Sequence, residues 1–136
     1  MVFLKWSKEL SVHMKEIDDQ HKILIGLINS AYSIDKKSKD YKKKLGVVLN
    51  ELVEFSRVHF STEETYFQKF NYPFANEHII AHEKLIIKVL QFKDRFDSKD
   101  EDILDDLTFF LTDWLKNHLM KHDFKYSKYF KEHGYI

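Results

Sequence analysis

Residues 40–70, DYKKKLGVVLNELVEFSRVHFSTEETYFQKF, decide the fold because they read as one long amphipathic helix. Apolar side chains recur every three or four positions, the spacing that lines one face of an α-helix: Leu45, Val48, Leu49, Leu52, Phe55, Phe67 and Phe70. His59 and Glu63 share this stripe, although an imidazole and a carboxylate are unusual on a face that packs into a core. The helix should end around Asn71-Tyr72-Pro73, because proline disfavours helical backbone at the residue before it.

Three further stretches repeat the helical spacing around this one. The first runs from about Asp18 to Ser33, and a third begins after Pro73. Ser98 followed by Glu101 has the form of a capping box, which predicts the start of a fourth helix there. Before Gly134, a short C-terminal helical piece is expected to carry Phe124, Tyr126, Tyr129 and Phe130.

Turn-forming residues are scarce, with 3 glycines and 1 proline in 136 residues, so the chain cannot reverse direction often. Four helices joined by short loops predict an all-α fold, an antiparallel up-down-up-down four-helix bundle. We expect residues 1–136 to form a single domain, with Met1 to Glu16 as an N-terminal arm outside the helices and a short C-terminal helix.

The composition excludes several classes of function. The absence of cysteine excludes disulfides, thiolate–zinc sites and iron–sulfur clusters. Lys plus Arg and Asp plus Glu both total 22, so no net field attracts nucleic acid or an anionic membrane. Charged residues interrupt the N-terminus before a secretory apolar run develops, and no segment is long and apolar enough to span a bilayer. We therefore expect a cytoplasmic protein without membrane insertion and without nucleic acid as a partner.

Histidines are the unusual feature, with 8 in the chain. Six polar residues interrupt the four apolar stripes: His21, His59, Glu63, His78, His82 and His118. His59 and Glu63 point the same way, as do His78 and His82, because residues four apart share a helix face. Burying these groups without partners would cost several kcal/mol each, and a bound metal removes that cost. The pattern therefore predicts a metal site inside the bundle.

The number of donors indicates two metal ions. Five histidines and a carboxylate exceed the four ligands of a tetrahedral zinc site, whereas two ions can share bridging carboxylates. Nitrogen and oxygen donors without sulfur favour iron, manganese or zinc, and iron is the usual choice when open positions serve dioxygen. A ferritin-like site is excluded because no Glu is followed three positions later by His, and a metalloprotease is excluded because H-E-x-x-H is absent.

Spacing leaves one candidate ligand open. His122 lies four positions after His118 and shares its face on a regular helix, whereas Asp123 lies roughly 140° away. By helical geometry alone, His122 is the expected ligand.

The polar residues occur in motifs whose order is informative: Asp18-Asp19-Gln20-His21, His59-Phe60-Ser61-Thr62-Glu63-Glu64, Tyr72-Pro73, His78-x-x-x-His82 and Trp114-Leu115-x-x-His118-x-x-x-x-Asp123. In this order and at these separations, from about Trp6 to Tyr126, the chain resembles a bacterial hemerythrin. The resemblance implies a non-haem di-iron centre with an oxo or hydroxo bridge between two iron ions. The implied ligands are His78, His82 and His118 on one iron, His21 and His59 on the other, and the bridging carboxylates Glu63 and Asp123. The family pattern thus favours Asp123 over His122 and implies that the helix loosens or ends there.

The function implied is reversible dioxygen binding for carriage, storage or delivery, without enzymatic activity and with an unidentified delivery partner. The iron with two histidines would keep an open position for dioxygen. Apolar side chains beside the ligands are expected to line the pocket: Leu24, Phe60, Trp114, Leu115 and Leu119. The same ligands also suit a di-iron enzyme or a sensor that handles dioxygen, peroxide or nitric oxide, and iron storage or donation.

Overall fold

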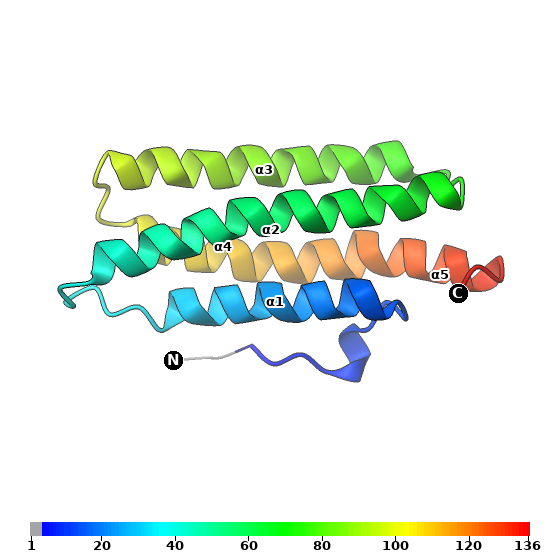
Figure 1. Cartoon of the computed structure of the whole chain (residues 1–136), viewed down its shortest axis with the longest axis horizontal. Helices are drawn as coiled ribbons and strands as arrows, with labels where there is room; N and C mark the ends of the chain where they lie inside the picture. Colours follow the sequence, from blue (N-terminus) through cyan, green and yellow to red (C-terminus); the bar gives the residue numbers. More distant parts are fainter. Residues whose placement is uncertain (1–3) are drawn as a thin grey trace.

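The computed structural model describes residues 4–136 and contains only helices and loops within that range. Five α-helices and two short helical segments follow one another along the chain: η1 (Lys8–Leu10), α1 (Lys15–Tyr32), α2 (Tyr41–Lys69), α3 (Ala75–Asp97), α4 (Ile103–His118), η2 (Leu119–Asp123) and α5 (Phe124–Glu132). Figure 1 shows α1 to α4 lying beside one another and alternating in direction, which is the antiparallel arrangement. The all-α four-helix bundle is confirmed, and α4, η2 and α5 together form its fourth rod.

The helices close into a ring, because α1 contacts α2, α2 contacts α3, and α4 contacts both α3 and α1. Two clusters of buried apolar side chains fill the interior and follow each other along the bundle axis. On α1, Ile17 and Leu24 belong to different clusters and flank His21, and Leu115 and Leu119 bracket the end of α4 in the same way. The polar residues of the stripes therefore lie between the two apolar clusters.

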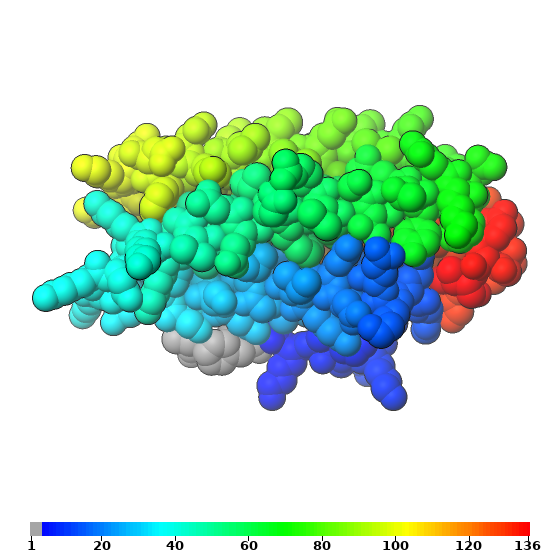
Figure 2. All heavy atoms as spheres, in the orientation of Figure 1, coloured from blue at the N-terminus to red at the C-terminus, as the bar shows by residue number. Residues whose placement is uncertain are grey.

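Residues 4–14 of the predicted N-terminal arm pack outside α1, whereas Lys15 and Glu16, also expected in the arm, form the first residues of α1. Residues 1–3 lie outside the described residues. Asn29 anchors the arm by two hydrogen bonds of 2.8 Å with the backbone N–H and C=O of Leu4. Trp6 packs against the apolar core and Lys22 lies 4.4 Å from the centre of its ring. Figure 2 shows the arm covering one side of the bundle.

The prediction that the fourth helix starts at Ser98 is wrong. Ser98 ends α3, since its N–H donates to the Asp94 carbonyl, and Lys99 then reverses the chain with a φ of 60°. The guanidinium of Arg95 binds the carboxylates of Asp100, at 2.7 Å, and Asp106, at 2.6 Å. This clamp holds the loop to the first turn of α4, which begins at Ile103.

The fourth rod is not a uniform α-helix. Residues Leu119–Asp123 form a π-helical turn between α4 and α5. A π turn accommodates one extra residue, so it rotates the chain that follows relative to a regular helix. The predicted C-terminal helix is confirmed as α5, and Gly134 follows its end with a φ of 71°.

Candidate metal centre

Seven buried side chains from all four rods meet between the apolar clusters. Each is at most 4% exposed: His21, His59, Glu63, His78, His82, His118 and Asp123. Their ligating atoms form two groups, and within each group the atoms lie within 4.8 Å of one another. The first group is Glu63, His78, His82 and His118, and the second is His21, His59 and Asp123.

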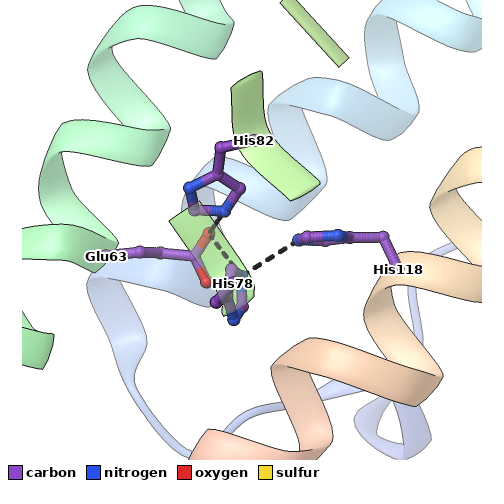
Figure 3. Close-up of side chains that lie close together, drawn as sticks. All are labelled: Glu63, His78, His82 and His118. Atoms are coloured by element: carbon purple, nitrogen blue, oxygen red, sulfur yellow. Dashed lines mark hydrogen bonds and ion pairs between the residues drawn. The ribbon is translucent and has the colours of Figure 1, made fainter. Parts of the chain in front are cut away.

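Figure 3 shows the first group, in which three imidazoles and the Glu63 carboxylate converge on one point. The Nε2 atom of His82 lies 3.2 Å from Glu63 Oε1, and the Nε2 atoms of His78 and His118 lie 3.2 Å apart. Helices α2, α3 and α4 each contribute to this group. The i,i+4 spacing of His78 and His82 places both rings on the inner face of α3.

The two carboxylates connect the groups. Asp123 Oδ2 lies 3.1 Å from Nε2 of His21, whereas Asp123 Oδ1 lies 3.1 Å from Nε2 of His118. Glu63 Oε1 lies 3.0 Å from Nε2 of His59 and 3.2 Å from that of His82. Each carboxylate thus faces nitrogen donors of both groups, the arrangement that two ions with shared bridging ligands require.

The geometry suits a metal centre, because several buried donor atoms of the cluster lack hydrogen-bond partners. Neither oxygen of Glu63 accepts a hydrogen bond, and Asp123 Oδ1 and His82 Nε2 also lack one although they are buried. Ligands about 2.1 Å from one ion and at right angles lie about 3.0 Å apart, close to the separations of 3.0 to 3.2 Å found here. Metal cations would satisfy these unpaired atoms and balance the two carboxylate charges.

The ionisation state of Glu63 and Asp123 also suits the binding of a cation. Burial, and for Glu63 the nearby Asp123, would raise the pKa of both carboxyls, but the imidazoles around them hold each pKa well below its usual range. The main stabilising neighbours are His59 for Glu63 and His118 for Asp123. Burial first, and then these carboxylates, raise the pKa of the Tyr126 hydroxyl well above its usual value. The carboxylates are therefore ionised beside a neutral phenol.

The π turn gives the two residues that spacing left open different surroundings. Asp123 ends the turn, is 1% exposed and reaches into the centre. His122 is half-buried at the surface, with its ring 5.2 Å from that of His118. Burial, together with His118 and His78, lowers the pKa of His122 to about 4. The structure thus brings Asp123 to the other six residues and leaves His122 outside, and the helix departs from α geometry where the family pattern implies.

Two polar residues behind the imidazoles were given no role by the sequence reasoning. Gln20 Oε1 accepts a hydrogen bond from His59 Nδ1 at 2.6 Å, and the Gln20 amide donates to Thr62 Oγ1 at 3.1 Å. Glu64 Oε2 lies 3.2 Å from Nδ1 of His82. Such contacts fix the tautomer and orientation of a ligating histidine. The available signal was adjacency, since Gln20 precedes His21 and Glu64 follows Glu63.

The five expected pocket residues lie near the centre in different surroundings. Phe60 stacks on His82 with ring centroids 3.7 Å apart, and Trp114 stacks on His118 at 4.4 Å. Leu115 and Leu119 line a largely apolar cavity of about 250 Å³ beneath the N-terminal arm, and Leu24 is buried in the core. The five side chains do not line one common pocket in the structure. Their role around dioxygen stays a prediction.

The four-helix bundle and its buried cluster of imidazoles and carboxylates place this chain in the class of helical-bundle metal-binding proteins. The Hemerythrin HHE cation binding domain matches residues 12–130, and the chain belongs to the hemerythrin family. None of the helices in residues 4–136 has the length and apolar character needed to cross a membrane.

Similar proteins agree with this family. The chain is 32% identical over 133 residues to the bacteriohemerythrin of Stenotrophomonas maltophilia, which covers 98% of this chain and 85% of that protein. It is 29% identical to the bacteriohemerythrin of Methylococcus capsulatus, over 93% of this chain and 96% of the relative. The crystal structure of a hemerythrin mutant superposes with a TM-score of 0.84 and 26% identity, over 94% of this chain and 97% of the other.

Proposed function

We propose that this protein binds dioxygen reversibly at a non-haem di-iron centre, for carriage, storage or delivery of dioxygen. The observation that carries the proposal is the asymmetry of the two donor groups. Three imidazoles serve one metal position and two serve the other, while Glu63 and Asp123 face both. A position with one imidazole fewer keeps room for a small exogenous ligand.

In this proposal one iron is held by His78, His82 and His118, the other by His21 and His59, and the bridges are Glu63 and Asp123. When bound, the two irons supply the electrons that reduce dioxygen and take them back when it leaves. The chain's own contribution is to hold the donors in place and to exclude water.

The surroundings favour binding over further reaction. Phe60 and Trp114 cover two of the imidazoles with aromatic faces, which limits access of water. Gln20 and Glu64 contact Nδ1 atoms, on the far side of each ring from the centre. They would therefore orient the imidazoles that hold the irons, and they lie on the far side of the rings from the metal positions.

The proposal is tested by metal analysis followed by reaction with dioxygen. About two irons per chain are expected, with a visible spectrum that forms when anaerobically reduced protein meets dioxygen and disappears on deoxygenation. Asp113→Ala, which removes an exposed carboxylate of α4, serves as a control that should keep both properties. Direct conversion to the diferric state without a reversible spectrum would favour the di-iron enzyme or sensor, and one colourless zinc per chain would contradict the di-iron centre. The cytoplasmic location and the delivery partner stay predictions.

A further inference from the structure

A hollow of about 380 Å³ opens on the surface between α3 and the fourth rod. Lys84 and Lys88 project from one wall, since residues four apart share a helix face, and Lys121 of the π turn stands on the other. All three lysines are exposed, and no carboxylate lines the hollow. Among the described residues these three form no ion pair, whereas Lys36, for example, pairs with Asp105. The hollow is therefore a positive patch whose lysines are not paired with carboxylates, although Lys88 also lies over the rings of Phe92 and Phe110.

One side chain of the candidate metal centre, His118, lies at the floor of this hollow. His118 lines the hollow although it is only 4% exposed, and Trp114 lies against it with ring planes 12° apart. The Nε2 atom of His118 faces the carboxylate of Asp123 at 3.1 Å. An aromatic ring and one imidazole thus separate solvent from the proposed iron position. Phe110 and Leu85 complete an apolar floor beneath the lysines.

We propose that this lysine-rimmed hollow docks an acidic one-electron carrier protein that returns the oxidised centre to its ferrous state. The proposal rests on the proposed function, because a dioxygen carrier that oxidises needs a reductant. The electron count is simple: two donor molecules are each oxidised by one electron as the two ferric ions become ferrous. The electrons enter through Trp114 and His118.

Charge complementarity selects the partner. The chain has no net charge, so attraction of a partner must come from a local patch. Clefts lined by charge of one sign raise association rates by about 10 to 1,000-fold for partners of opposite sign, and salt suppresses the effect. Complexes that transfer electrons are typically small and transient. A hollow with an apolar aromatic floor and a cationic rim suits that kind of encounter.

The test uses reduced plant-type [2Fe–2S] ferredoxin, an acidic one-electron carrier, as the probe. The patch variant Lys84→Glu, Lys88→Glu, Lys121→Glu is compared with the control variant Lys37→Glu, Lys42→Glu, Lys43→Glu. The control lysines are also exposed and lie at the α1–α2 end of the bundle, and both triples change the formal charge equally. A small uncharged reductant checks that the centre of each variant still accepts electrons.

Reduction of the diferric protein is followed in a stopped-flow instrument at several salt concentrations. At low salt the patch variant should react with ferredoxin about tenfold more slowly than the parent, with a flatter salt dependence, while the control stays within about threefold. Rates with the uncharged reductant should agree among all three proteins. Equal slowing of both triples, or no slowing of either, would overturn the docking site.

A second readout does not depend on iron. Carbodiimide cross-linking joins lysine amines to carboxylates of a docked partner, and mass spectrometry should place the links at Lys84, Lys88 and Lys121. Links concentrated elsewhere would reject the proposal. If the purified protein lacks a di-iron centre, the proposed function fails in the spectra, and the cross-link map still decides whether an acidic carrier docks at this hollow.

Discussion

At the residue scale, two consecutive residues lie in different surroundings: the carboxylate of Asp123 is buried, and the imidazole of His122 lies at the surface. Asp123 faces imidazoles of both donor groups, while His122 remains outside them. Asp123→Ala should therefore release metal, with the iron content falling by about half or more, because the bridge between the two positions is lost. His122→Ala should keep its iron. Metal analysis of both variants after desalting checks this, and iron loss in His122→Ala alone would contradict the ligand assignment.

The contact between Gln20 and His59 leads to a second prediction at this scale. The amide oxygen of Gln20 accepts a hydrogen bond from Nδ1 of His59, with the two atoms 2.6 Å apart, and this leaves Nε2 of His59 free to bind metal. Gln20→Leu should weaken iron binding about 10 to 100-fold, the usual effect of losing an outer hydrogen bond to a ligating histidine. Gln20→Glu keeps an acceptor and should lose less. The measurement is iron release to a chelator, and equal release from both variants would indicate that the acceptor is unimportant.

At the scale of elements, apolar periodicity was enough to predict the four rods and the C-terminal helix. Periodicity counts residues at a fixed angle, so it could not locate the π turn, where that angle changes. The family resemblance, rather than helical geometry, selected Asp123. The capping-box pattern at Ser98 failed because the Arg95 clamp on Asp100 and Asp106 organises the α3–α4 loop. Contacts between distant residues, such as Gln20 with His59, leave no periodic signal at all.

The π turn itself can be tested by changing its length. Deleting Lys121 brings His118 and Asp123 to a spacing of four, which keeps both on one face of a regular α-helix. Inserting one alanine after Lys121 turns Asp123 away by about a further 100° and rotates α5 with it. The deletion should retain iron and the insertion should lose it. Iron retention by both proteins would show that the register of the π turn does not matter.

At the scale of the whole molecule, the candidate centre joins all four rods at one level between two apolar clusters. Without metal, five imidazoles and two carboxylates are buried there with several atoms unpaired. This placement costs stability in the metal-free protein, and metal binding turns the same residues into cross-links between helices. The stability of the bundle should therefore depend strongly on its metal.

Removal of iron should lower the melting temperature by roughly 12–16 °C. When the dissociation constant for iron lies a thousandfold below the free iron concentration, binding contributes about 4 kcal/mol to the stability of the folded state. Each 1 kcal/mol shifts the melting temperature of a chain of this size by roughly 3–4 °C. Circular dichroism melts of the iron-loaded and chelator-treated protein provide the measurement. Asp123→Ala is the matched control, since its melting temperature should hardly respond to added iron. If the parent protein melts at the same temperature with and without iron, the centre does not tie the four helices together.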